Sequence, residues 1–200
     1  MDIWKYPLIA VAGYLLGSMS ASILLSRLAL GGDVRGKGSG NAGATNMARS
    51  FGLLAGFATL AGDFLKAVIA MAIGYRLCGD WGLMAGGVAC TTGHCFPIFY
   101  DFRGGKGISV GAAIGLMIDW RVFVGIILVF LLAAFLSKKA SLGSVCAAVA
   151  VVILSLVFAV PLPRLLLAIY AALLAIFQHR SNIKRLSEGT EPDFKAADTK

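Results

Sequence analysis

Apolar stretches separated by short polar segments follow one another along almost the whole chain. They are rich in Leu, Ala, Ile and Gly and carry few charged residues. A helix rises about 1.5 Å per residue, so about 20 apolar residues cross the roughly 30 Å of a bilayer interior. The pattern predicts membrane-spanning helices over residues 6–26, 51–75, 81–100, 107–118, 122–137, 140–160 and 165–177.

Two of the expected helices are short. Residues 107–118 would form a helix of only about 18 Å, and residues 165–177 one of about 20 Å. Such a helix crosses a bilayer only with tilt, with local thinning of the membrane, or as part of a loop that enters it. We expect about seven helices, or five if the short ones are partial. The first stretch lacks a small-residue cleavage pattern, so we expect it to be retained instead of removed as a signal peptide.

The composition agrees with this pattern. Hydrophobic residues make up 58% of the 200 residues and charged residues only 14%, whereas about a quarter of the residues of a soluble domain are charged. A membrane β-barrel would instead show segments of roughly ten residues with alternating polarity. We expect an all-α, polytopic integral membrane helix bundle, formed as one domain by residues 1–200, with a polar cytoplasmic tail at residues 187–200.

The net charge of +8 does not indicate a nucleic-acid-binding protein, because Lys and Arg occupy the short gaps between apolar stretches. When these gaps are assigned alternately to the two sides of a membrane, thirteen of the eighteen basic residues fall on one side, four on the other, and Lys66 inside a span. Cytoplasmic loops are enriched in Lys and Arg. We therefore expect the N-terminus outside and the C-terminus in the cytoplasm, which requires an odd number of crossings.

The cysteines and the two histidines do not indicate a metal site. No Cys-x-x-Cys spacing occurs, and three of the four cysteines lie in apolar runs, where Cys acts as a small hydrophobic residue. We expect no metal and no cofactor. The cysteines are Cys78, Cys90, Cys95 and Cys146.

Three polar clusters interrupt the apolar pattern, and the charge sorting assigns all three to the cytoplasmic side. The first, residues 33–49, combines glycines that allow sharp turns with neutral hydrogen-bond donors and one arginine. Such a segment at the start of a helix suits a phosphate, and a flexible Gly/Ser linker is the alternative. Its candidate ligands are Ser39, Gly40, Asn41, Gly43, Thr45, Asn46 and Arg49.

The second cluster, residues 93–107, has Gly104, Gly105 and Gly107 around Lys106, directly before a short expected helix. Backbone amides and an ammonium at a helix N-terminus form a second candidate anion site. His94 is either a ligand or a satisfied core residue. Nearby aromatic residues either wall the site or form a belt at the membrane interface. They are Phe96, Phe99, Tyr100 and Phe102.

The third cluster, residues 179–191, directly follows the last apolar stretch. Its basic residues suit an anchor on anionic lipid, but His179 and Asn182 are three apart and share one face if the helix continues. Asp63 and Lys66, inside the second expected helix, have the same spacing. We expect this pair to neutralise each other in the bundle interior, with a structural role.

Four motifs in order resemble one known family. They are Gly-Ser-Gly-Asn-x-Gly-Ala-Thr-Asn-x-x-Arg at 38–49, Gly-His-x-Phe-Pro-x-Phe at 93–99, Gly-Gly-Lys-Gly at 104–107 and His-x-x-Asn-Ile-x-Arg-Leu at 179–186. Over nearly its whole length the chain resembles the PlsY family of bacterial acyl-phosphate:glycerol-3-phosphate acyltransferases. Two small departures, at Ser109-Val110 and Pro192-Asp193, touch none of the candidate ligands.

The resemblance implies a seven-helix enzyme of the bacterial cytoplasmic (inner) membrane, with its active site on the cytoplasmic side. Its substrates would be acyl phosphate and glycerol 3-phosphate, and its environment membrane lipid. The acyl group would move to the sn-1 hydroxyl, giving 1-acyl-glycerol 3-phosphate and phosphate. The resemblance assigns catalysis and phosphate or glycerol binding to Ser39, Arg49, Lys106, His179 and Asn182, and the shaping of the first loop to Asn46.

The residues themselves constrain the mechanism. An acyl phosphate is already activated, so positioning and charge stabilisation are needed more than a covalent nucleophile. Neither histidine is followed by Asp five positions later, so a His-Asp base is unsupported. The acceptor of the hydroxyl proton stays open among His179, His94 and a substrate phosphate.

A transporter of an anionic phosphorylated metabolite is the alternative function, because broken helices with anion-binding loops also occur in transporters. The chain shows no internal repeat, however, and its polar clusters gather on one face instead of at the midplane. A non-catalytic lipid-binding subunit is a third possibility, but it would not need two anion sites. Turnover by purified protein without a gradient would exclude pure transport.

Overall fold

The apolar stretches are helical in the computed structural model, which describes residues 3–195. Within these residues the regular secondary structure consists of helices alone. In chain order the helices are α1 (Lys5–Ser18), α2 (Ala21–Ala29), η1 (Val34–Gly36), α3 (Ala44–Phe51), α4 (Leu53–Cys95), η2 (Ile98–Tyr100), α5 (Ile108–Ile118), α6 (Trp120–Ser137), α7 (Ala140–Val157), α8 (Leu162–Gln178) and α9 (Arg180–Ser187).

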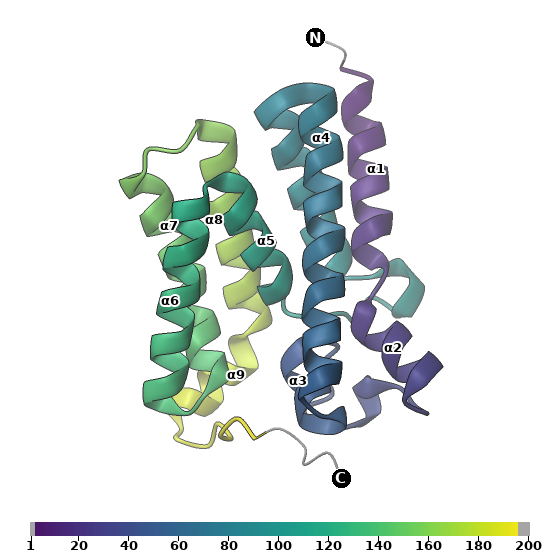
Figure 1. Cartoon of the computed structure of the whole chain (residues 1–200), viewed down its shortest axis with the longest axis vertical. Helices are drawn as coiled ribbons and strands as arrows, with labels where there is room; N and C mark the ends of the chain where they lie inside the picture. Colours follow the sequence, from purple (N-terminus) through teal and green to yellow (C-terminus); the bar gives the residue numbers. More distant parts are fainter. Residues whose placement is uncertain (1–2, 196–200) are drawn as a thin grey trace.

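Several of these helices are long and apolar enough to cross a membrane. By length and composition, four segments of the described chain qualify: Lys5–Ala29, Leu53–Tyr100, Trp120–Ser137 and Ala140–Val157. The pair α8 and α9, bent by 59°, is a fifth candidate. The protein is therefore a multi-pass helical membrane protein, as the sequence predicts (Figure 1).

Helix α4 is a hairpin of two arms. Its 43 residues include Cys78 and Gly79, whose backbone angles are not helical. Gly74 and Gly82 face each other across this turn, and a Cβ atom on either would collide with the carbonyl of the other. Glycine at both positions lets the two arms pack backbone against backbone. The two arms correspond to the separate helices expected at residues 51–75 and 81–100.

The first expected helix is broken, which the sequence does not predict. Helix α1 ends at Ser18, and α2 begins at Ala21 after Ser20, whose hydroxyl caps it by accepting from the backbone of Ile23. The ammonium of Lys66 donates to the carbonyls of Gly17 and Met19 at 2.9 Å each. A buried cation therefore satisfies the carbonyls that the break leaves without helical partners.

The lengths of two later helices, α5 and α8, can be compared with the lengths expected from the sequence. Helix α5 has eleven residues and is about 17 Å long, which confirms the short helix expected after Lys106. Helix α8 spans Leu162–Gln178, so the helix expected at residues 165–177 is confirmed but is four residues longer than predicted. Pro163 lies in the first turn of α8, where a proline does not disrupt helical hydrogen bonding.

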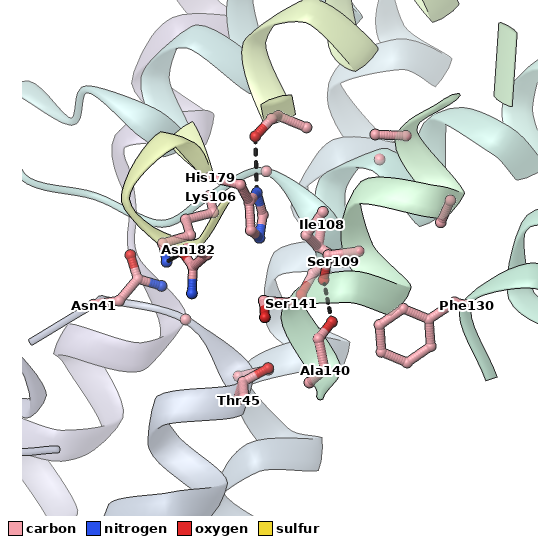
Figure 2. Close-up of a pocket in the computed structure, with 18 of the residues that line it drawn as sticks. Asn41, Thr45, Lys106, Ile108, Ser109, Phe130, Ala140, Ser141, His179 and Asn182 are labelled. Atoms are coloured by element: carbon pink, nitrogen blue, oxygen red, sulfur yellow. Dashed lines mark hydrogen bonds between the residues drawn. The ribbon is translucent and has the colours of Figure 1, made fainter. Parts of the chain in front are cut away.

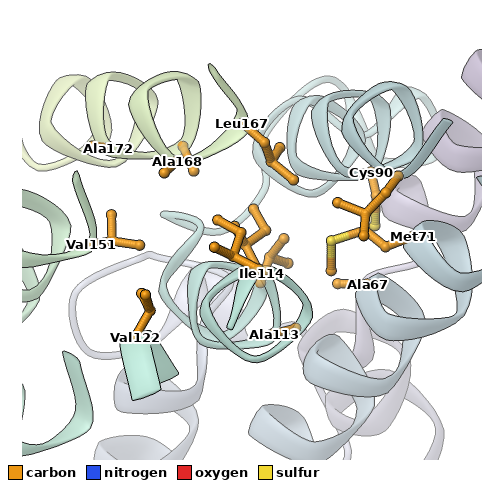
Figure 3. Close-up of a cluster of buried hydrophobic side chains, with 14 of the residues drawn as sticks. Ala67, Met71, Cys90, Ala113, Ile114, Val122, Val151, Leu167, Ala168 and Ala172 are labelled. Atoms are coloured by element: carbon orange, nitrogen blue, oxygen red, sulfur yellow. The ribbon is translucent and has the colours of Figure 1, made fainter. Parts of the chain in front are cut away.

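The core lies where α5 packs between the α4 hairpin and the three helices α6, α7 and α8. Figure 3 shows Ile114 at the centre of this cluster, with Met71 and Leu167 on its flanks. Val122 and Val151 bring α6 and α7 to the same core. Because α5 is short and buried among its neighbours, the loop that precedes it is held inside the bundle.

The two ends of the bundle differ. At one end, Nε of Arg164 contacts Asp80 at 2.7 Å and Nη1 donates to the carbonyl of Ile118, which ties α8 to the α4 turn and to α5. At the other end lie α2, α3 and α9 (Figure 1). The first and third polar clusters therefore meet at one end, as the charge sorting predicts; which side of the membrane this end faces remains a prediction.

Candidate active site

A cavity of about 750 Å³ lies between α3, the loop before α5, and helices α5 to α9. It brings together most of the candidate ligands named from the sequence, although they are spread over some 140 positions of the chain. The candidates that line it are Ser39, Gly40, Asn41, Gly43, Thr45, Asn46, Arg49, His94, Lys106, Gly107, His179 and Asn182.

Asn46 organises the first loop. Its Nδ2 donates to the carbonyls of Val34, Lys37 and Asn41 at 3.0–3.1 Å, and its Oδ1 accepts from the backbone of Ser39 at 2.9 Å. The side chain is 1% exposed. Its bonding capacity is therefore used by the loop, so Asn46 shapes the site, and the expectation that it also binds substrate directly is not supported.

A second set of contacts fastens this loop to the one before α5. Arg35 donates to Asp33 and, through Nη1, to the carbonyl of Tyr100 at 2.8 Å. The hydrogen bond from Arg35 holds the pKa of Asp33 well below its usual range. The carboxylate thus stays charged, and the two loops keep a fixed relation to each other.

The start of α3 presents donors to the cavity. Gly43, Ala44 and Thr45 line it, and no side chain caps the N-terminus of this helix, so first-turn N–H groups are available to an anion. Within the described residues, neither the Ser39 hydroxyl nor the Arg49 guanidinium forms a hydrogen bond with another side chain or with the backbone. Both groups are available to a ligand.

The glycines before Lys106 act differently from the expectation. The N–H groups of Gly104 and Gly105 donate to the carbonyls of Cys95 and His94, at 3.2 and 3.0 Å, and neither glycine lines the cavity. The prediction that their amides bind substrate is therefore wrong. A Cβ atom at Gly105 would collide with the imidazole of His94, so these glycines let the loop fold tightly against α4.

Lys106 belongs to a chain of polar contacts that crosses the site. Its ammonium donates to Oδ1 of Asn182, whose Nδ2 donates to Glu191 at 2.7 Å; the other oxygen of Glu191 accepts from Arg185 at 2.7 Å. Figure 2 shows Lys106 and Asn182 side by side at the cavity. Burial and the nearby Arg185 lower the pKa of Lys106 to about 8.

The cavity therefore has a positively charged end. Arg49, Lys106 and Arg185 line it together with a single carboxylate, Glu191. Burial raises the pKa of Glu191, but the Ser141 hydroxyl and the donors from Asn182 and Arg185 outweigh this effect, so that the net shift is downward. With three cations and one anion, this end is left with excess positive charge, which suits a bound phosphate.

The sequence reasoning missed Glu191 and Arg185 as site residues, although both lie in the third polar cluster. Their role depends on residues 191–194, which were expected to belong to a simple polar tail. Lys139 donates to the carbonyl of Glu191 at 2.5 Å and contacts Asp193, and the backbone of Phe194 donates to the carbonyl of Lys138. Residues 196–200 of that tail lie outside the described part of the chain.

His179 lies where α8 bends into α9. Its Nδ1 is 2.8 Å from the carbonyl of Ala175. A carbonyl only accepts, so Nδ1 carries the proton and Nε2 has a free lone pair. The imidazole points toward the space between Lys106, Thr45 and Ser141 (Figure 2). Asn182 reaches the same cavity despite the bend.

Beyond its charged end the cavity continues as an apolar groove between four helices. Of the two roles left open for the aromatic residues at 96–102, a wall of the site is not what the structure shows, because none of them lines this cavity. Small and branched side chains, together with Phe130, do so instead, and they leave room for an apolar ligand. They include Ile108, Ala112, Ile126, Phe130, Ala148, Val151, Ala172 and Ala175.

A membrane-embedded bundle whose cavity joins a cationic end to an apolar groove suits a protein that binds amphipathic phosphorylated molecules. A family model described as glycerol-3-phosphate acyltransferase matches residues 7–189. The chain belongs to this family, the PlsY family of integral membrane acyltransferases, and the resemblance recognised from its motifs is confirmed.

Individual relatives support the same family assignment. The chain is 40% identical to the glycerol-3-phosphate acyltransferase of Thermoanaerobacter pseudethanolicus, over 92% of this chain and 93% of that protein. It is 36% identical to the Bacillus subtilis protein of the same name, over 94% and 97% of the two chains. Its fold is similar to the crystal structure of PlsY (YgiH), an integral membrane glycerol 3-phosphate acyltransferase, in its glycerol 3-phosphate form, with a TM-score of 0.91, 33% identity and 96% of each chain covered.

Proposed function

We propose that this acyltransferase moves an acyl group from an acyl phosphate to the sn-1 hydroxyl of glycerol 3-phosphate. The products are 1-acyl-glycerol 3-phosphate (lysophosphatidate) and inorganic phosphate. We further propose that it works in the bacterial cytoplasmic membrane, with its cavity reached from the cytoplasm, where the loops rich in Lys and Arg would lie. Solved PlsY structures in a glycerol 3-phosphate form and a lysophosphatidic acid form support the acceptor and the product.

The observation that carries this proposal is the two-part cavity. Its charged end offers Arg49, Lys106 and Arg185 to phosphates. Its apolar groove, which helices α5 to α8 form, offers a surface to an acyl chain. A soluble phosphorylated triol and a lipid-soluble acyl donor would meet where the two parts join. The reacting carbonyl would then lie beside the phosphate-binding residues.

The reaction needs few chemical groups from the protein. The sn-1 oxygen attacks the carbonyl carbon of the acyl phosphate, a new C–O ester bond forms, and the bond from this carbon to the phosphoryl oxygen breaks. The bonding electron pair leaves with phosphate. Arg49 and Lys106 stabilise the negative charge that develops, and Ser39 and Asn182 orient the phosphates.

We assign acceptance of the hydroxyl proton to His179. Its Nδ1 is held as a donor by Ala175, so Nε2 is the basic nitrogen that faces the cavity. After the transfer, the proton passes to the departing phosphate. The histidine is therefore restored without a covalent intermediate.

The donor is tested with purified protein in detergent, without any gradient. Acyl phosphate should support formation of lysophosphatidate, whereas the coenzyme A thioester, which has no phosphate beside its carbonyl, should support little. Comparable rates with both donors would contradict the proposed donor. No turnover, together with binding of glycerol 3-phosphate, would favour the transporter alternative. Regiochemistry is checked by analysis of the product.

A further inference from the structure

A buried ionic cluster lies next to the Lys106 loop, and the proposed reaction leaves it without a role. Asp63 and Lys66 come from the first arm of α4, and His94 comes from the end of the second arm. Their exposed fractions are 0%, 8% and 3%. The expected pairing of Asp63 with Lys66 is confirmed at 2.7 Å. A charged pair inside a membrane bundle is costly, and such residues often serve function.

The ammonium of Lys66 is surrounded by acceptors. Besides Asp63, its Nζ atom lies 2.9 Å from the carbonyls of Gly17 and Met19 and 3.1 Å from Nδ1 of His94. An ammonium only donates, and a proton on Nδ1 would point at it across 3.1 Å, so this contact favours Nδ1 of His94 as an acceptor. The distance from this Nδ1 to Oδ1 of Asp63 is 3.6 Å, which is too long for a hydrogen bond.

The contact between Lys66 and His94 indicates which nitrogen of His94 carries the proton. A neutral imidazole that accepts at Nδ1 is a donor at Nε2. The Nε2 edge of the ring abuts Gly105, where a Cβ atom would collide with it. His94 also lines the cavity to which Lys106 belongs. With Nδ1 turned toward Lys66, the Nε2–H group lies on the side of the ring next to the Lys106 loop.

We propose that Asp63 and Lys66 are positioning residues that hold His94 in its Nε2–H form, so that His94 donates a hydrogen bond to a substrate phosphate beside Lys106. The proposal rests on the proposed function and deepens it. It gives the two histidines opposite tasks, because His179 is held as an acceptor at Nε2 and His94 as a donor at Nε2. It also removes His94 as an acceptor of the hydroxyl proton.

The protonated nitrogen can be observed without an activity assay. The chain contains two histidines, so a His179→Gln variant, purified without a histidine tag and labelled with nitrogen-15, has one imidazole signal set. Couplings between ring nitrogens and ring protons identify the protonated nitrogen. We expect the proton on Nε2. A proton on Nδ1, or on both nitrogens, would overturn the proposal whether or not the proposed reaction is correct.

Kinetics test the link to the substrate. The charge-neutral double variant Asp63→Asn/Lys66→Met should lower kcat/KM for glycerol 3-phosphate at least about tenfold. Adding His94→Asn to it should cause little further loss, because the three residues act through one hydrogen bond. Additive losses would mean that the pair acts on packing alone. The control is Thr92→Val. Thr92 lies on the same arm of α4 as His94, and the substitution removes its 2.7 Å hydrogen bond with Tyr170 of α8. We expect kcat/KM of this variant to stay within about twofold of wild type.

A further comparison does not depend on the double variant folding. The amide nitrogen of a glutamine at position 94 reaches the place of Nε2, whereas the shorter amide of an asparagine reaches only that of Nδ1. His94→Gln should therefore keep at least about tenfold more kcat/KM than His94→Asn. Equal activities would contradict the donor role of His94.

Discussion

The amide nitrogen of Asn182 donates a 2.7 Å hydrogen bond to the carboxylate of Glu191. Because its amide oxygen also accepts from Lys106, Asn182 links an acid near the chain end to the cation of a loop before α5. These two contacts fix the orientation of the amide group, with its oxygen toward the cation and its nitrogen toward the acid. The segment after α9 is thus part of the site.

Loss of the Glu191 carboxylate should disturb this chain of contacts. Glu191→Ala leaves the buried Asn182 amide and Arg185 without their partner, so kcat/KM should fall at least about tenfold and the thermal midpoint should drop. Steady-state kinetics and a thermal melt in detergent measure both. The matched control is Asp193→Ala, which removes an exposed contact to Lys139 and should change kcat/KM by no more than about twofold. Equal behaviour of the two variants would contradict the role of Glu191.

The pH dependence of activity should report Lys106. Its pKa is about 8 in the free protein, so the cationic form that binds phosphate prevails below pH 8 and is lost as the pH rises through that value. The profile of kcat/KM, which reflects the free enzyme, should therefore fall above about pH 8. In Lys106→Arg the side chain stays charged, and any remaining activity should not show this fall. An unchanged alkaline limb in that variant would assign it to another group.

Arg49 should be needed for its charge and for its shape. A charge-assisted hydrogen bond contributes roughly 1.5–3 kcal/mol, so Arg49→Ala should lower kcat/KM for glycerol 3-phosphate about 10-fold to 100-fold. Arg49→Lys should remain impaired, because a lysine cannot replace a bidentate contact. Lys138→Ala removes an exposed charge outside the cavity and should stay within about twofold. Near wild-type activity in folded Arg49→Ala would contradict the site assignment.

The apolar groove that helices α5 to α8 form should limit the length of the acyl chain. Ala148 lines it and is 7% exposed, whereas the next residue, Val149, is 46% exposed. Ala148→Phe fills part of the groove, so the ratio of activity with long to short acyl phosphates should fall at least about tenfold, with little change in KM for glycerol 3-phosphate. Val149→Phe should leave the ratio unaltered. A ratio unchanged in Ala148→Phe would mean that the acyl chain lies elsewhere.

The topology is open to chemical labelling. Ile3 precedes α1, and Glu188 follows α9 at the opposite end of the bundle. In a background with Cys78 and Cys146 replaced by alanine, an impermeant thiol reagent applied to intact cells should label Ile3→Cys but not Glu188→Cys. Permeabilised cells should show labelling at both positions. The opposite pattern in intact cells would put the cavity on the outer side.

Much of the fold follows from local patterns in the sequence. A run of apolar residues predicts a helix because each backbone group in lipid must find its partner within the segment. The short helix before Asp119 and the two arms of α4 were predicted in this way. The motifs also led to Arg49, Lys106, His179 and Asn182, all of which line the cavity, because glycine, basic and amide residues next to apolar runs are the chemistry that phosphates require.

Other features depend on contacts between distant parts of the chain, and no local pattern shows them. The break between α1 and α2 lies where the buried ammonium of Lys66, 49 positions after Gly17, offers carbonyl groups a substitute for helical hydrogen bonds. The amides of Gly104 and Gly105 are used by the end of α4 because the short α5 holds their loop inside the bundle. Glu191 is held at the site by α9 and by the α6–α7 loop, which binds the segment that carries it. Sequence determined which residues are available for chemistry, and tertiary packing decided which of their polar groups remain free for a substrate.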